Sequence, residues 1–212
     1  MALRETLGSG LTLLTFGGQE PELARYLPEL ARLRITVFRD FPYLYDGSLA
    51  YEQRYLQTYA DCAESIVALV LDGDTAVGAS TGLPLDAETP DFTQPFVNAG
   101  HDPARYFYCA ESVLLPAHRG RGVYPHLFRA REDHARRLGR FDASTFCCVQ
   151  RPPDHPRRPL GYRPLDVVWR RQGYAEQPML RTTFAWKDLD DDEETPKPMV
   201  FWVKSLRTEV NA

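Results

Sequence analysis

The chain has 212 residues, of which 43% are hydrophobic and 25% are charged, and its formal net charge is −4. This length suits one large domain or two small ones and allows a substantial buried core. The acidic balance argues against a dedicated nucleic-acid-binding protein, and no apolar run approaches the roughly 20 residues that cross a bilayer. The N-terminal segment lacks the charged and then apolar layout of a signal peptide. These features predict a cytoplasmic protein without nucleic-acid or membrane partners.

The four cysteines, at positions 62, 109, 147 and 148, are too few for a disulfide framework in a chain of this length. Cys147 and Cys148 are adjacent on an expected strand, so their side chains should point to opposite faces. Reduced thiols that pack as small hydrophobic groups are the simplest interpretation. A metal site would need two paired ligand sets, and neither the cysteines nor His155 have that spacing. We expect no metal.

Turn residues and hydrophobic spacing divide the chain into successive strands and helices. Short runs rich in apolar and β-branched residues predict strands, and apolar residues three or four positions apart predict helices. Strands are expected at residues 11–16, 65–71, 75–83, 106–115, 144–149, 178–186 and 199–206. Helices are expected at about residues 29–38, 48–60, 123–138 and 165–172, with one short helix in the loop at residues 87–99.

The order of these elements, β-α-α-β-β-β-α-β-α-β-β, predicts an α/β fold in which helices cover both faces of a mixed sheet. No internal repeat and no linker divides the sequence. We therefore expect a single domain over residues 1–212. The last strand is apolar at residues 199–203, which suits either packing within the sheet or contact with a second chain in a homodimer.

A strand, a turn and a helix meet at the run Arg119-Gly-Arg-Gly122. Glycine lets a backbone approach a ligand closely, and the first N–H groups of a helix have no partner inside it. The positive end of the helix dipole and two arginines add to this, so the turn favours a phosphate-bearing ligand. The alternative is an exposed turn with two solvated arginines.

The segment Pro116-Ala-His-Arg-Gly-Arg-Gly-Val-Tyr124 resembles the acetyl-CoA motif of the GNAT superfamily of N-acetyltransferases, written Arg/Gln-x-x-Gly-x-Gly/Ala. Arg119 and Gly122 match fixed positions of the motif, and Gly120 matches a common intervening residue. The order of elements also matches over nearly the whole chain. The resemblance implies an acyltransferase that moves an acetyl group directly from acetyl-CoA to a primary amine, here of a small molecule.

The same resemblance implies where acetyl-CoA would bind. The strand before the motif should carry a bulge and splay from its neighbour, which exposes its backbone. The pantetheine arm would pair with that backbone at Ser112, Val113 and Leu114. The pyrophosphate would be held by consecutive N–H groups of Arg119, Gly120, Arg121, Gly122, Val123 and Tyr124.

Two residues depart from the family pattern. Tyr124 stands where the family usually has glycine or alanine, so its side chain must find room. Pro125 follows and has no N–H to offer a ligand. Arg119 and Arg121 could offset the lost donor, because charge-assisted hydrogen bonds are about twice as strong as neutral ones.

Acetyl transfer needs a neutral amine and a proton for the departing thiolate. Glu111 is the candidate base, since the family often places an acidic residue at this point of the strand; the alternative is a glutamate paired with an arginine. Many relatives have a tyrosine as the acid four residues before the glycine that ends the last helix, but that position is Trp169, which cannot deliver a proton. Tyr162 is the favoured substitute, and a packed loop tyrosine is its alternative. Trp169 and Tyr124 leave a second function open, an acyl-CoA-binding sensor or regulatory module with weak activity.

The residues that would contact the acceptor are expected in two loops. Tyr43 and Tyr45 lie between the first two helices, and His155 lies in the basic, proline-rich loop at residues 151–163. Aromatic side chains suit an amine with apolar substituents. The acidic run at residues 188–194 favours a cationic acceptor, but three arginines favour an acceptor with a carboxylate or phosphate. The two sets of clues oppose each other; the arginines are Arg151, Arg157 and Arg158.

Overall fold

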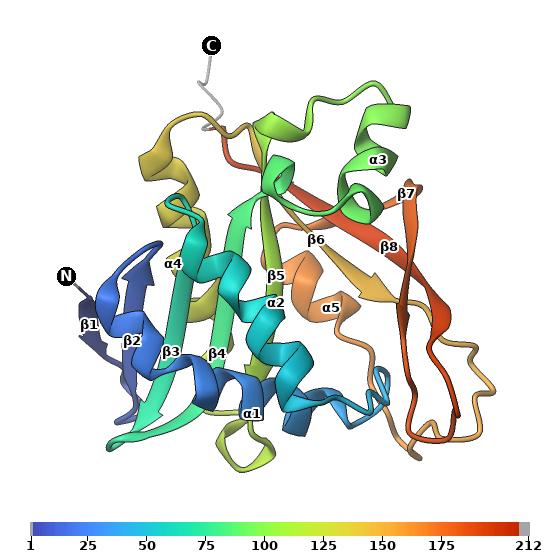
Figure 1. The fold of residues 1–212 in the computed structure, drawn as a ribbon, viewed down its shortest axis with the longest axis horizontal. Helices are drawn as coiled ribbons and strands as arrows, with labels where there is room; N and C mark the ends of the chain where they lie inside the picture. The colour runs from blue at the N-terminus through green and yellow to red at the C-terminus, as the bar shows by residue number, and fades with distance from the viewer. Residues whose placement is uncertain (1, 208–212) are drawn as a thin grey trace.

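The computed structural model describes residues 2–207, and one eight-stranded mixed sheet runs through them in the order β1-β2-β3-β4-β5-β6-β8-β7 (Figure 1). Neighbouring strands are antiparallel except for β5 and β6, which are parallel. The strands are β1 (Leu3–Thr6), β2 (Thr12–Gly17), β3 (Ile66–Asp72), β4 (Thr75–Pro84), β5 (Tyr106–Leu114), β6 (Ala143–Val149), β7 (Ala175–Trp186) and β8 (Thr195–Ser205).

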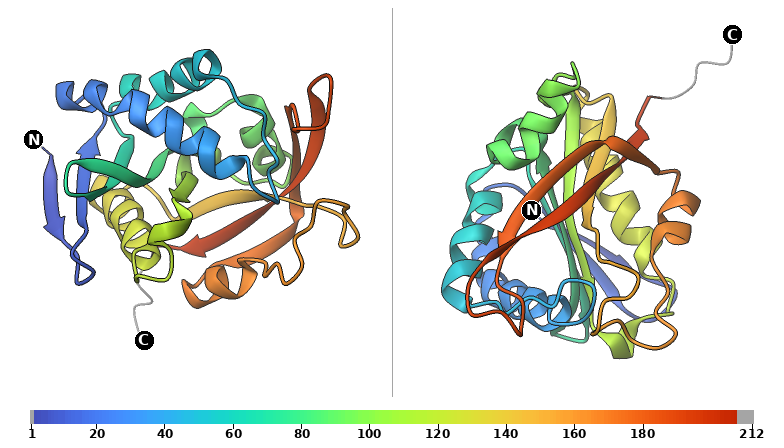
Figure 2. Two further views of the ribbon diagram at one scale, coloured as in Figure 1. Left: turned by 90° about the horizontal axis from the view of Figure 1, so that it is seen from below. Right: turned by 90° about the vertical axis from the view of Figure 1, so that its right-hand side faces the viewer.

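Helices cover both faces of the sheet, as the sequence predicts. One face carries α1, α2 and α3, and the opposite face carries α4 and α5 (Figure 2). The helices are α1 (Leu27–Phe38), α2 (Leu49–Asp61), α3 (Pro90–Asn98), α4 (Tyr124–Leu138) and α5 (Asp166–Arg171). Short 3-10 helices lie at Pro21–Arg25, Leu85–Ala87, Pro103–Arg105 and Pro116–His118.

The predicted fold class is confirmed, and the differences from the predicted order are additions to it. Strand β1 was not predicted because all four of its residues are exposed, so its sequence has no apolar face to mark it. The short helix expected at residues 87–99 is the nine-residue α3, which contains Pro95 and buries Phe92 and Phe96.

Two local sequence signals behave as expected. The hydroxyl of Ser48 accepts the N–H of Tyr51 at 3.3 Å and caps α2. Gly139 ends α4 in the left-handed conformation, at a φ of 74°.

Cys147 and Cys148 belong to separate core clusters, which confirms that their side chains lie on opposite faces of β6. Strand β8 lies between β6 and β7, so its apolar residues pack within the sheet.

The sheet opens between β5 and β6. These strands pair only from Tyr106 to Tyr108 on β5, and beyond that point β5 has β4 on one side alone. A bulge accompanies the separation: Thr81 pairs with Glu111 but Leu83 pairs with Tyr108, so β5 has one more residue than β4 here. The bulge and the splay that the resemblance implied are therefore both present.

Gly82 lies opposite this bulge, where the neighbouring atoms leave no room for a side chain. A Cβ atom at Gly82 would lie 2.6 Å from Cε1 of Phe107 and 3.1 Å from the carbonyl oxygen of Tyr108. Since Phe107 is fully buried, Gly82→Ala should destabilise the fold by about 1–3 kcal/mol through overpacking. Urea unfolding checks this against Gly8→Ala, where nothing lies within 4 Å of the new Cβ. Equal stability of the two variants would contradict the prediction.

Candidate functional site

Three cavities with shared walls follow the opening between β5 and β6. The loop cleft, of about 760 Å³, lies against residues 119–125. The central cavity, of about 250 Å³, lies between the splayed strands and includes Glu111 and Tyr124 in its lining. The tyrosine cavity, of about 90 Å³, lies between α2, β5 and β7. Phe38 and Tyr43 line all three.

The loop before α4 presents a row of free backbone donors. The N–H groups of residues 120–124 make no hydrogen bond within the part of the chain that the structure describes. Gly120 and Gly122 have φ angles of 75° and 73°, a conformation that glycine adopts without strain. The N–H of Arg119 is not available, because it donates to the carbonyl of Pro116 at 3.2 Å. The row of donors is therefore one residue shorter than the sequence predicted.

The two arginines of this loop lie differently. Arg119 lines the loop cleft, and its Nε donates to the carbonyl of Leu114 at 3.1 Å. Arg121 does not line the cleft: its Nη2 donates to the carbonyl of Ser9 at 2.8 Å, and its Nη1 lies 4.0 Å from Asp72. The side chain of Arg121 thus holds the loop to its surroundings, and only its backbone N–H belongs to the free row.

The predicted pantetheine-binding residues lie on β5 beyond the splay. Ser112 and Leu114 line the loop cleft. Val113 is fully buried in the core, so only its backbone could meet a ligand. Beyond Tyr108 the edge of β5 that faces β6 has no strand partner among the described residues. This edge and the free row of N–H groups border the same cleft.

Glu111 is buried in an ion-pair network that joins α1, α2 and β5. Arg34 of α1 donates from Nη1 to Glu111 and from Nε to Glu52 of α2. Tyr55 also donates to Oε2 of Glu111 at 3.3 Å. The predicted alternative, a glutamate paired with an arginine, is therefore present. However, Glu111 also lines two cavities, and its Oε1 has no hydrogen-bond partner within residues 2–207.

Tyr124 finds room for its side chain beside Trp169. The hydroxyl of Tyr124 accepts the indole N–H of Trp169 at 3.3 Å, and its ring packs edge-on against Phe128. Tyr124 lines both the loop cleft and the central cavity. Burial raises the pKa of the phenol, although the hydrogen bond from Trp169 opposes this. The departure from the family pattern therefore places a protonated phenol next to the tryptophan that replaces the usual acid.

Tyr162 also lines the central cavity and the loop cleft. Its ring packs edge-on against Phe41, and the guanidinium of Arg158 lies over it, 5.1 Å from the ring centre. Burial raises the pKa of Tyr162, and the charge of Arg158 opposes this shift.

Arg131 of α4 is a functional candidate that the sequence did not reveal. It is buried, it lines the central cavity, and its Nη1 donates to the carbonyl of Glu111 at 3.0 Å. No carboxylate of the described chain pairs with it, and its Nε has no hydrogen-bond partner there. Arg131 is one of four arginines on α4, and nothing in the sequence distinguished it from the other three.

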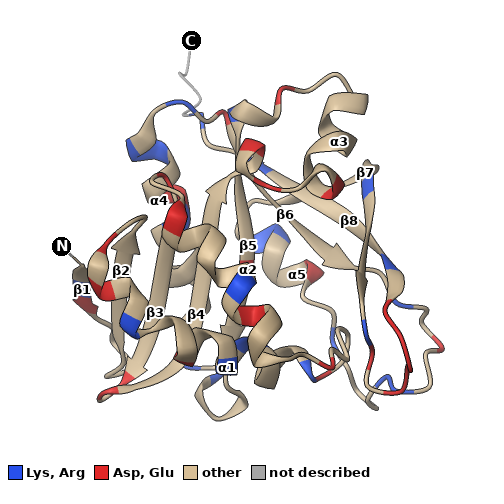
Figure 3. Cartoon of the chain, viewed as in Figure 1, with Lys and Arg blue, Asp and Glu red and all other residues tan. Residues whose placement is uncertain are grey.

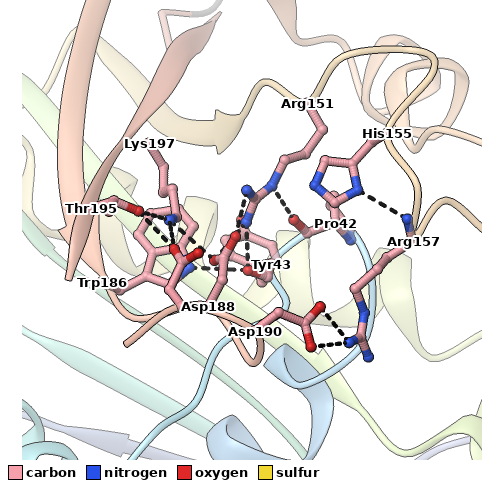
Figure 4. Close-up of polar contacts among 11 residues, drawn as sticks. Pro42, Tyr43, Arg151, His155, Arg157, Trp186, Asp188, Asp190, Thr195 and Lys197 are labelled. Atoms are coloured by element: carbon pink, nitrogen blue, oxygen red, sulfur yellow. Dashed lines mark hydrogen bonds and ion pairs between the residues drawn. The ribbon is translucent and has the colours of Figure 1, made fainter. Parts of the chain in front are cut away.

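A pair of charged side chains, Arg151 and Asp188, holds the backbone at Tyr43, one of the two predicted acceptor tyrosines (Figure 4). Arg151 donates to the carbonyls of Pro42 and Tyr43 at 2.7 and 2.8 Å. It also makes a two-point contact with Asp188, at 2.7 and 2.9 Å. Tyr43 lines all three cavities and Tyr45 lines the tyrosine cavity. Both predicted tyrosines thus border the opening.

Two ion pairs, Arg151–Asp188 and Arg157–Asp190, join the basic loop to the acidic run. The run lies at the end of the β7–β8 hairpin, beside basic residues (Figure 3). Asp190 accepts two hydrogen bonds from Arg157, at 2.6 and 2.7 Å, and Asp188 also pairs with Lys197. His155 lies outside the three cavities, where its Nδ1 accepts the N–H of Arg157 at 3.2 Å. The structure therefore does not bring His155 together with the other predicted site residues.

The described residues contain no cluster of histidine, cysteine, aspartate or glutamate suited to a metal ion. Burial raises the pKa of the Cys147 and Cys148 thiols, that of Cys148 to about 12, so both stay protonated. None of the helices within residues 2–207 has the length and apolar character needed to cross a bilayer.

Glu88 follows the 3-10 helix after β4 and is half-buried. Burial raises its pKa to about 7; a backbone hydrogen bond from Thr89 opposes the shift, and the charge of Glu111 adds to it. The folded state therefore binds this proton more tightly than the unfolded state, whose glutamate pKa is about 4.5. Stability contributed by the protonated form is lost as the pH rises through about 7.

Glu88→Gln removes this titration, so the melting temperature of the variant relative to the native chain should rise between about pH 5 and about pH 8. Thermal unfolding at the two pH values checks it. Glu64→Gln is the matched control: hydrogen bonds from Arg140 lower the pKa of Glu64 below 4.5, so the melting temperature of this variant relative to the native chain should stay constant over this pH range. A constant difference for Glu88→Gln would contradict the prediction.

Comparisons with known proteins come from structure alone. No family model and no curated protein sequence matches the chain. Ribosomal-protein-alanine N-acetyltransferase from Brucella melitensis superposes with a TM-score of 0.56 at 12% identity, over 85% of this chain and 94% of that one. The GNAT-family acetyltransferase from Streptococcus pneumoniae gives 0.53 at 9% identity, over 91% and 98%. An aminoglycoside 6′-N-acetyltransferase complexed with coenzyme A gives 0.53 at 14% identity, over 92% and 97%.

Each match covers at least 85% of this chain and at least 94% of the other chain. At these identities the likeness concerns the fold. The chain has the fold of the GNAT superfamily of acetyltransferases.

Proposed function

We propose that the protein is an N-acetyltransferase that moves an acetyl group from acetyl-CoA to the primary amine of a small molecule. The observation that carries this proposal is the free row of N–H groups at residues 120–124, which borders a cleft leading to the buried carboxylate of Glu111. Such a row binds phosphate oxygens. The fold supports the proposal, since a structural neighbour holds coenzyme A.

Acetyl-CoA would be held by the residues that border the loop cleft. The pyrophosphate would bind the N–H groups of residues 120–124, with the side chain of Arg119 nearby. The pantetheine arm would bind the unpaired backbone edge of β5 at Ser112, Val113 and Leu114. Bound acetyl-CoA supplies the activated acetyl thioester, and the chain supplies orientation, a base and an acid.

Glu111 would accept the proton of the amine. Its Oε1 is free of hydrogen bonds within the described chain, and its position between two cavities lets it meet both substrates. Arg131 would favour negative charge that develops in the central cavity, because a buried and unpaired guanidinium stabilises an oxyanion or a thiolate. In this arrangement the proton of the amine would go to Glu111, and the negative charge of the reaction would develop near Arg131.

For the acid we favour Tyr124 over Tyr162, which the sequence suggested. An indole N–H can only donate, so the bond from Trp169 occupies an acceptor site of the Tyr124 hydroxyl and leaves the phenolic proton free. A raised pKa keeps that phenol protonated at neutral pH. Tyr162 remains a second candidate, because it lines the same cavity.

The alternative function is an acyl-CoA-binding sensor with weak activity. Trp169 and Tyr124 were its support in the sequence, but in the structure they form a hydrogen-bonded pair at the central cavity, which favours the enzyme. A free-thiol assay with acetyl-CoA and a panel of amines separates the two functions. Binding of coenzyme A without release of thiol on any amine would favour the sensor.

Glu111→Gln should lower kcat by about 100- to 10,000-fold and abolish the acidic limb of the pH–rate profile, because an amide cannot take the proton of the amine. Thiol release measured across the pH range checks this. Glu52→Gln is the matched control: Glu52 shares Arg34 with Glu111 but lines none of the three cavities. An unchanged profile in Glu111→Gln, or the same change in both variants, would remove Glu111 from this role.

Tyr124→Phe should lower kcat by about 100-fold or more, since it removes the proton for the thiolate and keeps the packed ring. The KM for acetyl-CoA should change little. Steady-state kinetics of Tyr124→Phe and Tyr162→Phe, with circular dichroism to confirm folding, measure the two contributions. A large loss in Tyr162→Phe together with a small loss in Tyr124→Phe would assign the acid to Tyr162.

A further inference from the structure

The tyrosine cavity has walls of aromatic rings from segments far apart in the sequence. On α2, Tyr51 and Tyr55 stack with a ring separation of 6.4 Å and an angle of 7° between their planes. The faces of such rings are electron-rich and attract cations. Two of the rings already have cations of the chain over them: Arg34 lies 4.1 Å from the ring centre of Tyr55, and Arg151 and Lys197 lie 5.8 and 5.9 Å from that of Trp186. The tyrosine rings of the lining without such a cation from the described chain are Tyr43, Tyr45, Tyr51 and Tyr108.

Negative charge lies at the base of this cavity. Two carboxylates, Glu52 and Glu111, share the single guanidinium of Arg34, so one negative charge is left when both are ionised. Glu111 lines the cavity, and its unpartnered Oε1 belongs to a side chain that is almost fully buried. A buried carboxylate oxygen without a donor is costly, and a ligand that brings an N–H donor relieves that cost.

Basic residues do not offset this charge. Arg34 is the only basic side chain that lines the tyrosine cavity within residues 2–207, and both carboxylates already use it. Among the loop arginines, Arg151 and Arg157 are paired with aspartates, so the conflict between the two sets of sequence clues is resolved here. Two basic residues for which no ion pair is found within residues 2–207, Arg131 and Arg158, line the central cavity instead.

The volume of the cavity limits what enters it. About 90 Å³ is close to three times the roughly 30 Å³ that one water molecule occupies in the liquid, and it is smaller than the ~150 Å³ cavity that admits benzene. A short alkyl chain fits this space. A larger substituent would have to extend out of this cavity, toward solvent or the central cavity.

We infer that the tyrosine cavity selects a small aliphatic primary amine that enters as a monocation, with its alkyl chain among the tyrosine rings and its nitrogen at Glu111. This inference rests on the proposed acetyl transfer and names the class of acceptor. Acceptors with a carboxylate or phosphate are disfavoured, because the added anion would face the charge of Glu111 and Glu52 across apolar walls.

Matched amines test the selection. Acetyl transfer to butylamine is compared with transfer to 4-aminobutyrate, which differs by a carboxylate at the far end of the chain. The kcat/KM for butylamine should be at least about 10-fold higher, since one uncompensated charge in a partly buried site costs more than a factor of ten. Equal rates, or faster transfer to 4-aminobutyrate, would overturn the inference while the proposed acetyl transfer stands.

Failure of the proposed function gives a different result. Release of coenzyme A thiol on none of the amines, with coenzyme A still bound in a calorimetric titration, would overturn the acetyl transfer and this inference together. Transfer to larger amines but not to butylamine would overturn the inference alone.

Tyr51 shows whether the acceptor binds in this cavity. Tyr51 lies in the first turn of α2, is half-buried and lines neither the central cavity nor the loop cleft. Tyr51→Ala removes a ring against which the alkyl chain would pack, so the KM for butylamine should rise by about 4-fold or more, the equivalent of roughly one buried CH2 group. Tyr51→Phe keeps the ring and should leave the KM unchanged, and the KM for acetyl-CoA should not move in either variant. An unchanged KM for butylamine in Tyr51→Ala would place the acceptor elsewhere.

Discussion

The separation of two parallel strands is the constraint on which the rest of the site depends. Strands β5 and β6 pair at three positions and then part, so a stretch of β5 backbone inside the protein lacks a partner strand. Backbone polar groups in such a place cost free energy unless something else binds them. The extra residue of the bulge, which Gly82 accommodates, turns β5 at this point. The cavities exist because the sheet is left open here.

Charged side chains stabilise the walls of that opening. Arg34 joins α1 to α2 and to β5, and Arg151 joins the loop after α1 to the β7–β8 hairpin. Both guanidinium groups are mostly buried and both make several hydrogen bonds, which is the condition under which buried charge is tolerated. The network of Arg34 differs in one respect, because it holds one carboxylate more than its charge can balance. One of the two carboxylates, Glu111, lies between the cavities.

Much of the fold could be predicted because its elements carry local patterns. The buried strands and amphipathic helices show apolar spacing, and Ser48 and Gly139 mark helix ends. Strand β1 could not be predicted because it is exposed on both faces. In the site, the row of free N–H groups in the Arg119–Tyr124 loop was predicted from a local motif. The sequence did not reveal that the N–H of Arg119 is already used, or that the side chain of Arg121 binds the carbonyl of Ser9.

The rest of the site depends on contacts between distant parts of the chain. Trp169 meets Tyr124, and Arg151 meets Asp188, only once the fold has formed. Neither Arg131 nor Glu88 belongs to a spacing pattern, so their burial beside Glu111 leaves no trace in the sequence. The loop arginines and the acidic run gave opposite indications about the charge of the acceptor for the same reason. Their ion pairs join segments that are distant in the sequence and meet only in the folded protein.

Phe38 and Tyr43 line all three cavities, and this shared wall has an energetic consequence. A molecule in the loop cleft that fixes these two rings also fixes one side of the tyrosine cavity. The free energy of filling one space then depends on whether the other is filled, and thermodynamic linkage makes that dependence equal in both directions. Under the proposed function, whichever substrate bound first would change the affinity of the second by the same factor, through a pair of aromatic rings that both would contact.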